Sequence, residues 1–367
     1  MRAFVFFVLA FGCPTLATAT EPPKKAEQQF KNIQSFKGMP AHDIDPAMEF
    51  MSRALGVGCE HCHVSVADGQ WPMEKDDKQA KRTTRKMIAM QQRINRDFFG
   101  GHQEVTCATC HAGRVEPLAT PPMARHEEAA KAAPAPASVR VDEVLQKFVT
   151  ATGGKPAWDK LKTRVSQTTF VGPPTGIPLE VTQLAPDRWL ARMISKHGSF
   201  EQGFDGKSGW QRSPRGDVHD LGGSDLADAR RDAPLALPLV LPSLVSELKV
   251  IADALVGKGN AHVLEGTSGD VVERLYFDDK SGLLVRWSTR LHTPLGDLPE
   301  ETSFEDYRKV DGVMLPFTVV RNIAGEAQTI KYQSIKHNVP VDEAQFARPA
   351  ATPTPTPKPA ATPTPAR

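Results

Sequence analysis

Two short stretches of the sequence have residue types and a spacing that point to covalent and metal chemistry. CEHCH occupies residues 59–63 and CATCH residues 107–111, and each holds two thiols followed directly by a histidine. This C-x-x-C-H pattern is typical of c-type haem attachment, in which the thiols form thioethers with the haem vinyl groups and the histidine becomes the proximal iron ligand. The candidate attachment residues are Cys59, Cys62, Cys107 and Cys110.

Two other kinds of site are built from paired thiols. One is a zinc ion bound by all four thiolates, and the other is a pair of redox-active disulfides. Neither explains the histidine that follows each pair, His63 in the first motif and His111 in the second. We therefore expect two covalently bound haem c groups with these histidines as proximal ligands.

Methionine-bearing stretches with helical character precede both motifs. The first helix is expected from Pro46 to about Leu55, with Asp45 as its N-cap and Gly56 and Gly58 after its end. The second is expected from about residue 77 to 99, with an apolar stripe of Met87, Met90, Ile94 and Phe98. Methionine on a helical stripe is most often core packing, so the residues alone leave open which sulfur binds iron. The candidates are Met48, Met51, Met87 and Met90.

The segment from about residue 32 to 114 resembles the haem-binding module of the photosynthetic reaction-centre cytochrome c subunit and of related small dihaem proteins. The resemblance is carried by MEFMSRALGVGCEHCH, and by TRKMIAMQQRIN followed by VTCATCHAGR. In that family a helix supplies methionine to the iron and the C-x-x-C-H motif follows after a turn. The resemblance implies Met48 as distal ligand of the first haem and Met87 of the second, with Met90 as the fallback for Met87.

This sequence departs from the family pattern in two ways. The photosynthetic subunit has four haems, whereas only two motifs occur here. In that subunit a histidine near the end of such a helix binds another haem, and His102 stands at a comparable position. His102 is therefore either an exposed loop residue, a replacement axial ligand or a group that tunes the second haem.

The N-terminus has the features of a secretory signal peptide over residues 1–20. Arg2 precedes an apolar run of about ten residues and then small residues, a run too short to cross a bilayer. We expect export to the periplasm and no transmembrane segment. A buried apolar helix is the alternative, and Cys13 lies in a poor context for a lipid anchor.

The composition divides the remaining chain into four parts. A haem domain is expected over residues 21–116, a Pro/Ala-rich linker over 117–137, a β domain over 138–348 and a Pro/Thr-rich disordered tail over 349–367. Hairpin turns such as FDGKSG and KVDG separate short strand-like runs in the β domain. We therefore expect a multidomain protein, with a mostly α dihaem domain followed by an α+β domain whose antiparallel sheet is curved into an incomplete β-barrel.

The β domain resembles Lol-type lipoprotein carriers in stretches such as YFDDKSGLLVRW, FEDYRKVDGVMLPF and NVPVDEAQF. The resemblance implies a sheet closed over by helices, with a concave face that could hold a hydrophobic ligand. A packed core without a ligand is the alternative. No nucleophile constellation, metal-ligand spacing or phosphate loop is visible in this part of the sequence.

The net charge of +2 argues against nucleic acid as the main partner. The favoured function is single-electron transfer between redox partner proteins, with the β domain used for docking or for binding a hydrophobic ligand. One alternative is a peroxidase-like enzyme with one open haem face. Another is a protein that binds a hydrophobic ligand and senses redox state.

Overall fold

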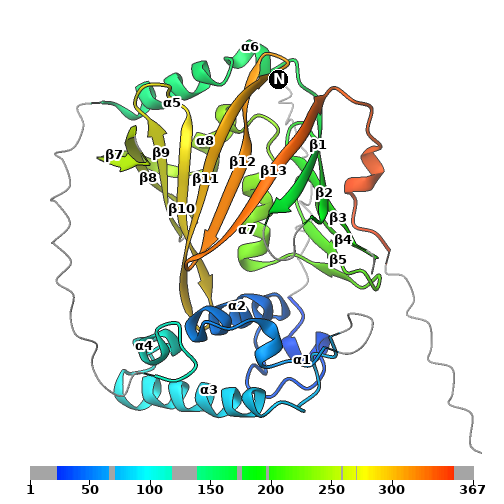
Figure 1. The fold of residues 1–367 in the computed structure, drawn as a ribbon, viewed down its shortest axis with the longest axis vertical. Coiled ribbons are helices and arrows are strands. Elements are labelled where there is room, and N and C mark those ends of the chain that lie inside the picture. Colours follow the sequence, from blue (N-terminus) through cyan, green and yellow to red (C-terminus); the bar gives the residue numbers. More distant parts are fainter. Residues whose placement is uncertain are drawn as a thin grey trace, which may run out of the picture.

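The computed structural model describes residues 23–65, 71–117, 139–171, 176–195, 198–257, 259–269 and 271–350. The expected signal peptide with Cys13, nearly all of the expected linker and most of the tail lie outside these residues. The described chain forms a helical region, residues 23–117, and a β region, residues 139–350 (Figure 1). A helical part followed by a curved antiparallel sheet confirms the expected fold class.

The helices are short except for two in the helical region. The helical region contains α1 (Ala26–Gln29), η1 (Ala41–Asp43), α2 (Ile44–Leu55), η2 (Cys59–His61), α3 (Gln79–Phe98) and α4 (Cys107–His111). The β region contains α5 (Val141–Ala151), α6 (Lys155–Trp158), α7 (Gly223–Asp232), α8 (Leu237–Leu244) and η4 (Glu343–Phe346).

Helix α2 buries one face and stops where the sequence predicts. Its buried residues recur at helical spacing, and Gly56 ends it in the left-handed conformation at φ 65°. A side chain at Gly56 would meet the backbone of Gly113, so glycine also permits this close approach. The expected N-cap, Asp45, is wrong, because the preceding turn η1 starts the helix earlier and Asp43 is the N-cap.

Helix α3 forms as expected, but the expected apolar stripe is not its buried face. Met87, Met90 and Phe98 are 36%, 48% and 78% exposed. The buried residues are Ile88, Gln91 and Asn95. The two amide side chains are buried because they bind the backbone of Val105, the segment that leads into the second motif.

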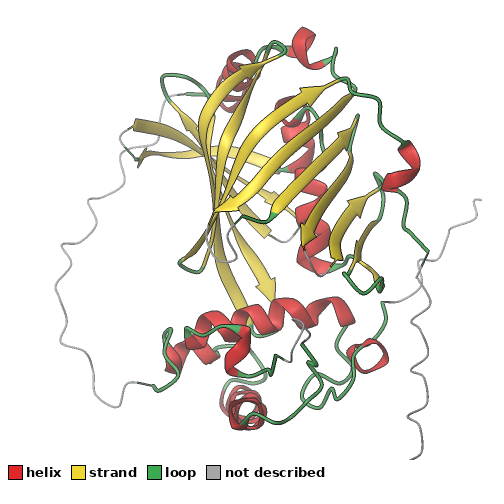
Figure 2. Ribbon diagram, turned by 45° about the vertical axis from the view of Figure 1, so that its right-hand side comes forward, coloured by secondary structure: helices red, strands yellow, loops and turns green. Residues whose placement is uncertain are grey.

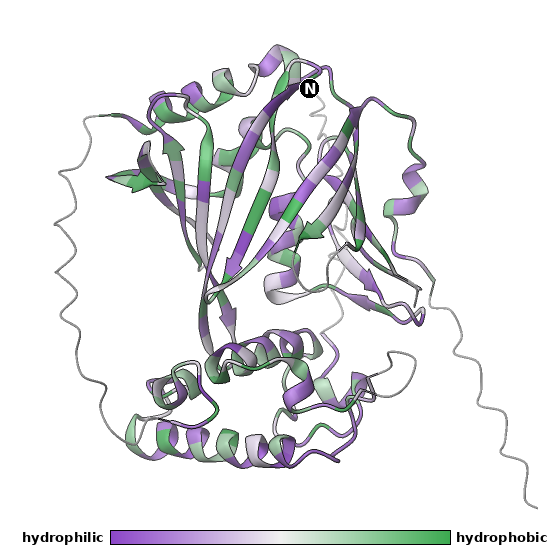
Figure 3. Cartoon of the chain, viewed as in Figure 1, coloured by the Kyte–Doolittle hydropathy of each residue, from purple (hydrophilic) through white to green (hydrophobic). Residues whose placement is uncertain are grey.

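The β region is built on a single antiparallel sheet. Its spatial order is β6-β5-β4-β3-β2-β1-β13-β12-β11-β10-β9-β8-β7, so β6 and β7 are free edges and the sheet is not closed into a barrel. Hydrophobic and hydrophilic residues alternate along the strands, as expected when one face is covered (Figure 3). The strands are β1 (Thr163–Val171), β2 (Pro178–Leu184), β3 (Arg188–Ser195), β4 (Gly198–Phe204), β5 (Gly209–Arg212), β6 (Val218–Asp220), β7 (Ser246–Val256), β8 (Gly259–Ser268), β9 (Val271–Asp278), β10 (Leu284–Thr293), β11 (Gly296–Val310), β12 (Val313–Ile323) and β13 (Glu326–His337).

Helices α7 and α8 connect the two edge strands and lie within the curve of the sheet (Figure 2). The two helices are separated by a short segment that contains Pro234. Helix α8 packs with α5 against strands β7 to β10 around Leu241, Phe148 and Phe277. The concave face of the sheet is therefore covered by helices.

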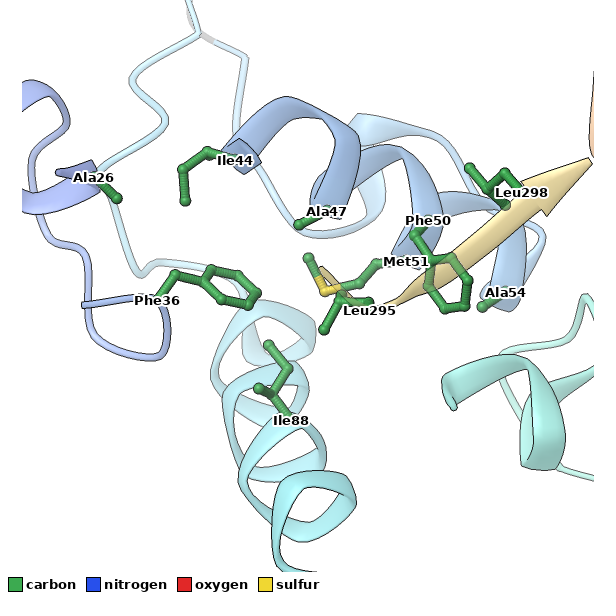
Figure 4. Close-up of a cluster of buried hydrophobic side chains, with 10 residues drawn as sticks. All are labelled: Ala26, Phe36, Ile44, Ala47, Phe50, Met51, Ala54, Ile88, Leu295 and Leu298. Carbon is green, nitrogen blue, oxygen red and sulfur yellow. The ribbon is translucent and has the colours of Figure 1, made fainter. Parts of the chain in front are cut away.

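The helical region packs against the turn between β10 and β11. Leu295 from this turn and Leu298 from the start of β11 join the core of the helical region, where Phe50 of α2 contacts them (Figure 4). Gln103 donates a hydrogen bond to the carbonyl of Pro294 at 3.0 Å. Gly296, at φ +140°, faces Phe50 so closely that an added Cβ would lie 2.8 Å from its ring. The two regions thus share one hydrophobic cluster.

Candidate functional site

The first motif forms one tight turn. The 3₁₀ turn η2 begins at Cys59, whose carbonyl accepts hydrogen bonds from the backbone N–H groups of Cys62 at 3.2 Å and His63 at 2.9 Å. Cys59 is exposed and Cys62 is half-buried. Two thiols and one imidazole are therefore presented by five consecutive residues, as thioether attachment requires.

The first motif lies against the N-terminal half of α3. Cys62 Sγ is 3.8 Å from Thr84 Oγ1 on that helix, and Lys78 donates a hydrogen bond to the carbonyl of Glu60. Met87 follows Thr84 by three residues and so lies one turn further along the same side of the helix.

His63 is held in a state that suits metal ligation. Burial lowers the pKa of its imidazole, and the carbonyl of Met73 opposes only part of that effect. Its Nδ1 atom is buried and makes no hydrogen bond to any described residue. A neutral imidazole is the form that binds a metal ion.

The second motif occupies the short helix α4. Thr106 caps its start, where its backbone N–H donates to Thr109 Oγ1 at 3.0 Å. After the motif, the N–H of Gly113 donates to the carbonyl of Ala54 at 2.9 Å, which ties this segment to the end of α2. The second motif is thus fixed by α2 on one side and, through Val105, by α3 on the other.

The imidazole of His111 has a defined orientation. Its Nδ1 atom is 2.9 Å from the carbonyl oxygen of Arg114, an acceptor that requires the proton to be on Nδ1. The lone pair of Nε2 is then free to bind a metal ion. A metal-binding histidine commonly donates its other ring N–H to a carbonyl in this way, so His111 fits the proximal role.

The candidate methionines differ in their surroundings. Met51 is only 8% exposed and lies inside the core between α2 and α3 (Figure 4). Met48 is partly buried at the margin of that core, which Cys107 also contacts. Met87 and Met90 are on the exposed side of α3. Met48 and Met87 are therefore more accessible to a ligand than Met51.

His102 is an exposed residue of the loop between α3 and α4. Its backbone N–H donates to the carbonyl of Phe99 at 3.0 Å, which closes the turn around Gly100 and Gly101. None of the four motif cysteines forms a disulfide with another described residue. Within the described ranges, no group of three or more His, Cys, Asp and Glu side chains is arranged to hold a metal ion.

The β region contains a cavity of about 310 Å³ between the concave face of the sheet and the segments around α6, α7 and α8. This volume is at the lower end of the range of small-molecule sites, which begins at roughly 300 Å³. The lining is largely apolar and includes Leu179, Val181, Leu235, Leu315, Ile330 and Ile335. Three tryptophans also contribute: Trp158, Trp189 and Trp287.

Charged side chains line one part of this cavity. Arg321 of β12 binds Glu300 at 2.6 Å and Asp228 of α7 at 2.5 Å, and Arg231 of α7 also binds Asp228 at 2.5 Å. Sequence reasoning missed this network. Its members come from α7, β11 and β12, and no local spacing connects them before the sheet forms.

Comparisons with known proteins find similar folds at low sequence identity. A lipoprotein-sorting protein domain from Vibrio parahaemolyticus has 10% identity and a TM-score of 0.42, covering 56% of this chain and 94% of that one. A LolA superfamily protein from Nitrosomonas europaea has 14% identity and a TM-score of 0.41, with coverage of 56% and 97%. A DUF1329 family protein from Desulfovibrio piger has 11% identity and a TM-score of 0.41, with coverage of 58% and 99%.

Structural similarity at these identities and TM-scores does not show which ligand or partner this chain binds. No curated protein is similar enough to the chain to count as a match.

In the part of the chain that the structure describes, no helix is both long and apolar enough to cross a membrane. Residues 12–144 match the family described as photosynthetic reaction centre cytochrome C subunit. This range contains both C-x-x-C-H motifs and the helices before them. This part of the chain is therefore similar to a family of c-type cytochromes.

Proposed function

We propose that the chain is an exported dihaem c-type cytochrome that transfers single electrons between partner proteins. The observation that carries the proposal is the repeated motif, in which two cysteines that form no disulfide and a histidine share one short turn. Haem c would supply a one-electron ferric–ferrous couple, and a methionine ligand would raise its potential. The residues that would hold the two haems are Cys59, Cys62 and His63, and Cys107, Cys110 and His111.

The protein residues orient and protect the ligand set. The carbonyl of Arg114 keeps the proton of His111 on Nδ1, so that the lone pair of Nε2 would be available to a haem iron. Gln91 and Asn95 hold Val105 from the neighbouring helix, which fixes the approach of the chain to Cys107. A rigid attachment suits electron transfer, because oxidation state then changes without movement of the ligands.

Met48 and Met87 are the proposed distal ligands, with Met90 as the fallback for Met87. The family resemblance assigns Met48 to the first haem and Met87 to the second. The contact between Thr84 and Cys62 brings the helix of Met87 next to the first motif as well. Variants with a single haem separate these two assignments.

The β region is proposed to bind a hydrophobic ligand. This second role is supported by the cavity itself, which has an apolar lining and three tryptophans. We place the mature protein in the periplasm, where haem is attached to exported chains and where the expected signal peptide would deliver it.

The test of the first role uses the full chain matured with haem. Haem content is measured for the wild type, for C59A/C62A and for C107A/C110A, and each protein is titrated by spectroelectrochemistry. We expect two haems in the wild type and one in each double variant, with the red charge-transfer band of methionine-ligated ferric iron and no binding of carbon monoxide. A haem that lacks this band and binds carbon monoxide would contradict electron carriage and support the peroxidase-like alternative.

The ligand assignment is tested in the single-haem backgrounds. Met87→Ala is expected to remove the band in C59A/C62A, which keeps only the second haem, and Met48→Ala to remove it in C107A/C110A. Loss of the band in the opposite backgrounds would show that each helix serves the other motif. Met193→Ala, in strand β3 of the other region, is the matched control and should leave both bands unchanged.

A further inference from the structure

Among the arginines that line the cavity, Arg164 differs from Arg231 and Arg321 in its partners. Arg164, in β1, is only 9% exposed and lines the cavity. Its guanidinium donates three hydrogen bonds of 3.1 Å, from Nε to His337 Nε2, from one terminal nitrogen to Gln183 Oε1, and from the other to the carbonyl of Leu235. All three acceptors are neutral groups.

No carboxylate of the described residues forms an ion pair with Arg164. Arg231 and Arg321 line the same cavity, and both are paired with acidic side chains. The acidic lining residue Asp232 interacts electrostatically with Arg231 and Arg321, whereas no carboxylate of the described residues acts on the pKa of Arg164. Burial lowers the pKa of Arg164 to about 10, so the side chain is still a cation at neutral pH. A buried cation without an anion is costly, which makes this position unusual.

The histidine next to Arg164 cannot supply the missing negative charge. His337 Nδ1 is 3.0 Å from the carboxylate of Asp311, so the proton is on Nδ1 and Nε2 accepts from the arginine. Burial and the nearby Arg164 lower the pKa of His337, which keeps the ring neutral. Asp311 itself is separated from Arg164 by the whole imidazole and is 60% exposed.

Donors remain available at this end of the cavity. A guanidinium has five N–H groups, and the three bonds above leave two of them without a described partner. Tyr332 also lines the cavity, and Arg164 lies near enough to act on the pKa of its hydroxyl. Burial and Asp232 raise the pKa of Tyr332 and outweigh the opposite effect of Arg164, so the hydroxyl keeps its proton and can donate.

The apolar lining lies beside these donors. Leu235 contributes its carbonyl to Arg164 and its side chain to the cavity, and Ile330 and Ile335 flank Tyr332 on β13. The ring of Trp158 stacks under the guanidinium, 5.7 Å from its centre, and fixes the arginine in place. The cavity therefore combines an unmatched cation and free donors with an apolar surface.

We propose that the cavity binds an amphipathic anion, whose carboxylate or phosphate head pairs with Arg164 and the Tyr332 hydroxyl and whose chain lies on the apolar lining. A bidentate head would use the two free guanidinium donors and neutralise the buried charge. The inference rests on the proposed ligand-binding role of the β region and is independent of the haem role.

Calorimetric titration of the haem-loaded full chain tests the proposal with three probes of equal chain length. Palmitate and hexadecyl phosphate carry an anionic head, and hexadecanol does not. We expect one or both anions to bind roughly tenfold or more tightly than the alcohol, because a hydrogen-bonded charge pair is worth about one to two factors of ten. The better anion identifies which head the site prefers.

Arg164→Gln is expected to weaken the binding of the anion by roughly tenfold or more, which removes the preference for it. The affinity for hexadecanol should stay within about threefold of the wild-type value. Tyr332→Phe removes only a hydroxyl, should fold normally, and is expected to weaken the anion by a smaller factor. Arg188→Gln is the matched control, since Arg188 is a surface arginine paired with Glu343, and should change nothing.

The possible failures have different meanings. Equal affinity of the wild type for all three probes, or equal losses for anion and alcohol in Tyr332→Phe, would overturn the anion site while leaving a hydrophobic-ligand function intact. Absence of binding for every probe by the correctly haem-loaded protein would overturn the proposed ligand-binding role as well. Neither result affects the proposed electron transfer, which the haem titration measures separately.

Discussion

At the scale of single residues, the two motifs are identical in pattern and different in surroundings. His111 has a carbonyl acceptor for Nδ1, whereas Nδ1 of His63 is buried without one among the described residues. An imidazole that donates a hydrogen bond from its second nitrogen is a stronger ligand, which favours ferric iron. We therefore expect the two haems to have different reduction potentials. If the distal ligands are alike, the haem bound by His111 should have the lower potential. Separate redox titrations of C59A/C62A and C107A/C110A measure the two potentials.

A second prediction at this scale separates iron ligation from packing in α2. Met51→Ala is expected to destabilise the protein by roughly 2 to 4 kcal/mol, because it opens a cavity in the core, while both charge-transfer bands remain. Met48→Ala is expected to remove one band at a smaller cost in stability, since Met48 is only partly buried. Chemical unfolding and the ferric spectrum are the two measurements. A Met51→Ala protein that lacks a band would reverse the roles of the two methionines.

The sequence predicts the motif residues because their chemistry is local. Two thiols and a histidine need only a five-residue turn, and η2 and α4 provide it. The role of the Arg114 carbonyl is not predictable, because any residue type has a carbonyl there. The unmatched charge of Arg164 is equally hidden, since its surroundings depend on the pairing of β1 with β13, which are far apart in the chain.

At the scale of elements, the periodicity of apolar residues predicts that a helix exists better than it predicts which face of the helix is buried. Both long helices form where expected, but α3 buries Gln91 and Asn95 in preference to Met87 and Met90. The amides are buried because three hydrogen bonds to Val105 compensate for the loss of water. Hydrophobicity alone cannot reveal a backbone partner ten residues away.

The contact between α2 and the β10–β11 turn gives a prediction of its own. Gly296→Ala is expected to weaken the contact by roughly 1 to 3 kcal/mol, since the new Cβ would press on Phe50 and the backbone has a positive φ. Hydrogen exchange of the α2 amides should increase. Gly325→Ala is the control, because it also has a positive φ, at +98°, and an added Cβ would have no atom within 4 Å. Equal exchange in the two variants would mean that strain, and not the contact, is responsible.

At the scale of the whole molecule, a carboxyl group near the contact between the two regions makes stability depend on pH. Burial raises the pKa of Asp225 in α7 to about 7, and the carboxylates of Asp228 and of Asp45 in the helical region act in the same direction, against Arg321. The folded state therefore holds a proton that the unfolded chain has already lost. Stability is expected to fall as the pH rises from about 4 to about 7, and to change little from this group above that range.

Asp225→Asn tests this expectation because it removes the charge and nearly preserves the shape. The variant should be more stable than the wild type by roughly 1 to 3 kcal/mol at pH 8, and the difference should disappear near pH 4. Urea unfolding at several pH values measures it, with the exposed Asp217→Asn as control. A constant difference at all pH values would show that titration of Asp225 is not the cause.

The place of β1 in the sheet has a consequence for the order in which the molecule assembles. Every other pair of neighbouring strands is also consecutive in the sequence, whereas β1 pairs with β13, for example Arg164 with His337. Hairpins close short loops quickly, and distant segments meet late. The strands should therefore form two meanders, β1 to β6 and β7 to β13, which join last along this seam. Because Arg164, Gln183, His337 and Tyr332 come together only at that seam, a ligand bound there would recognise only the completed sheet and would hold its two halves together.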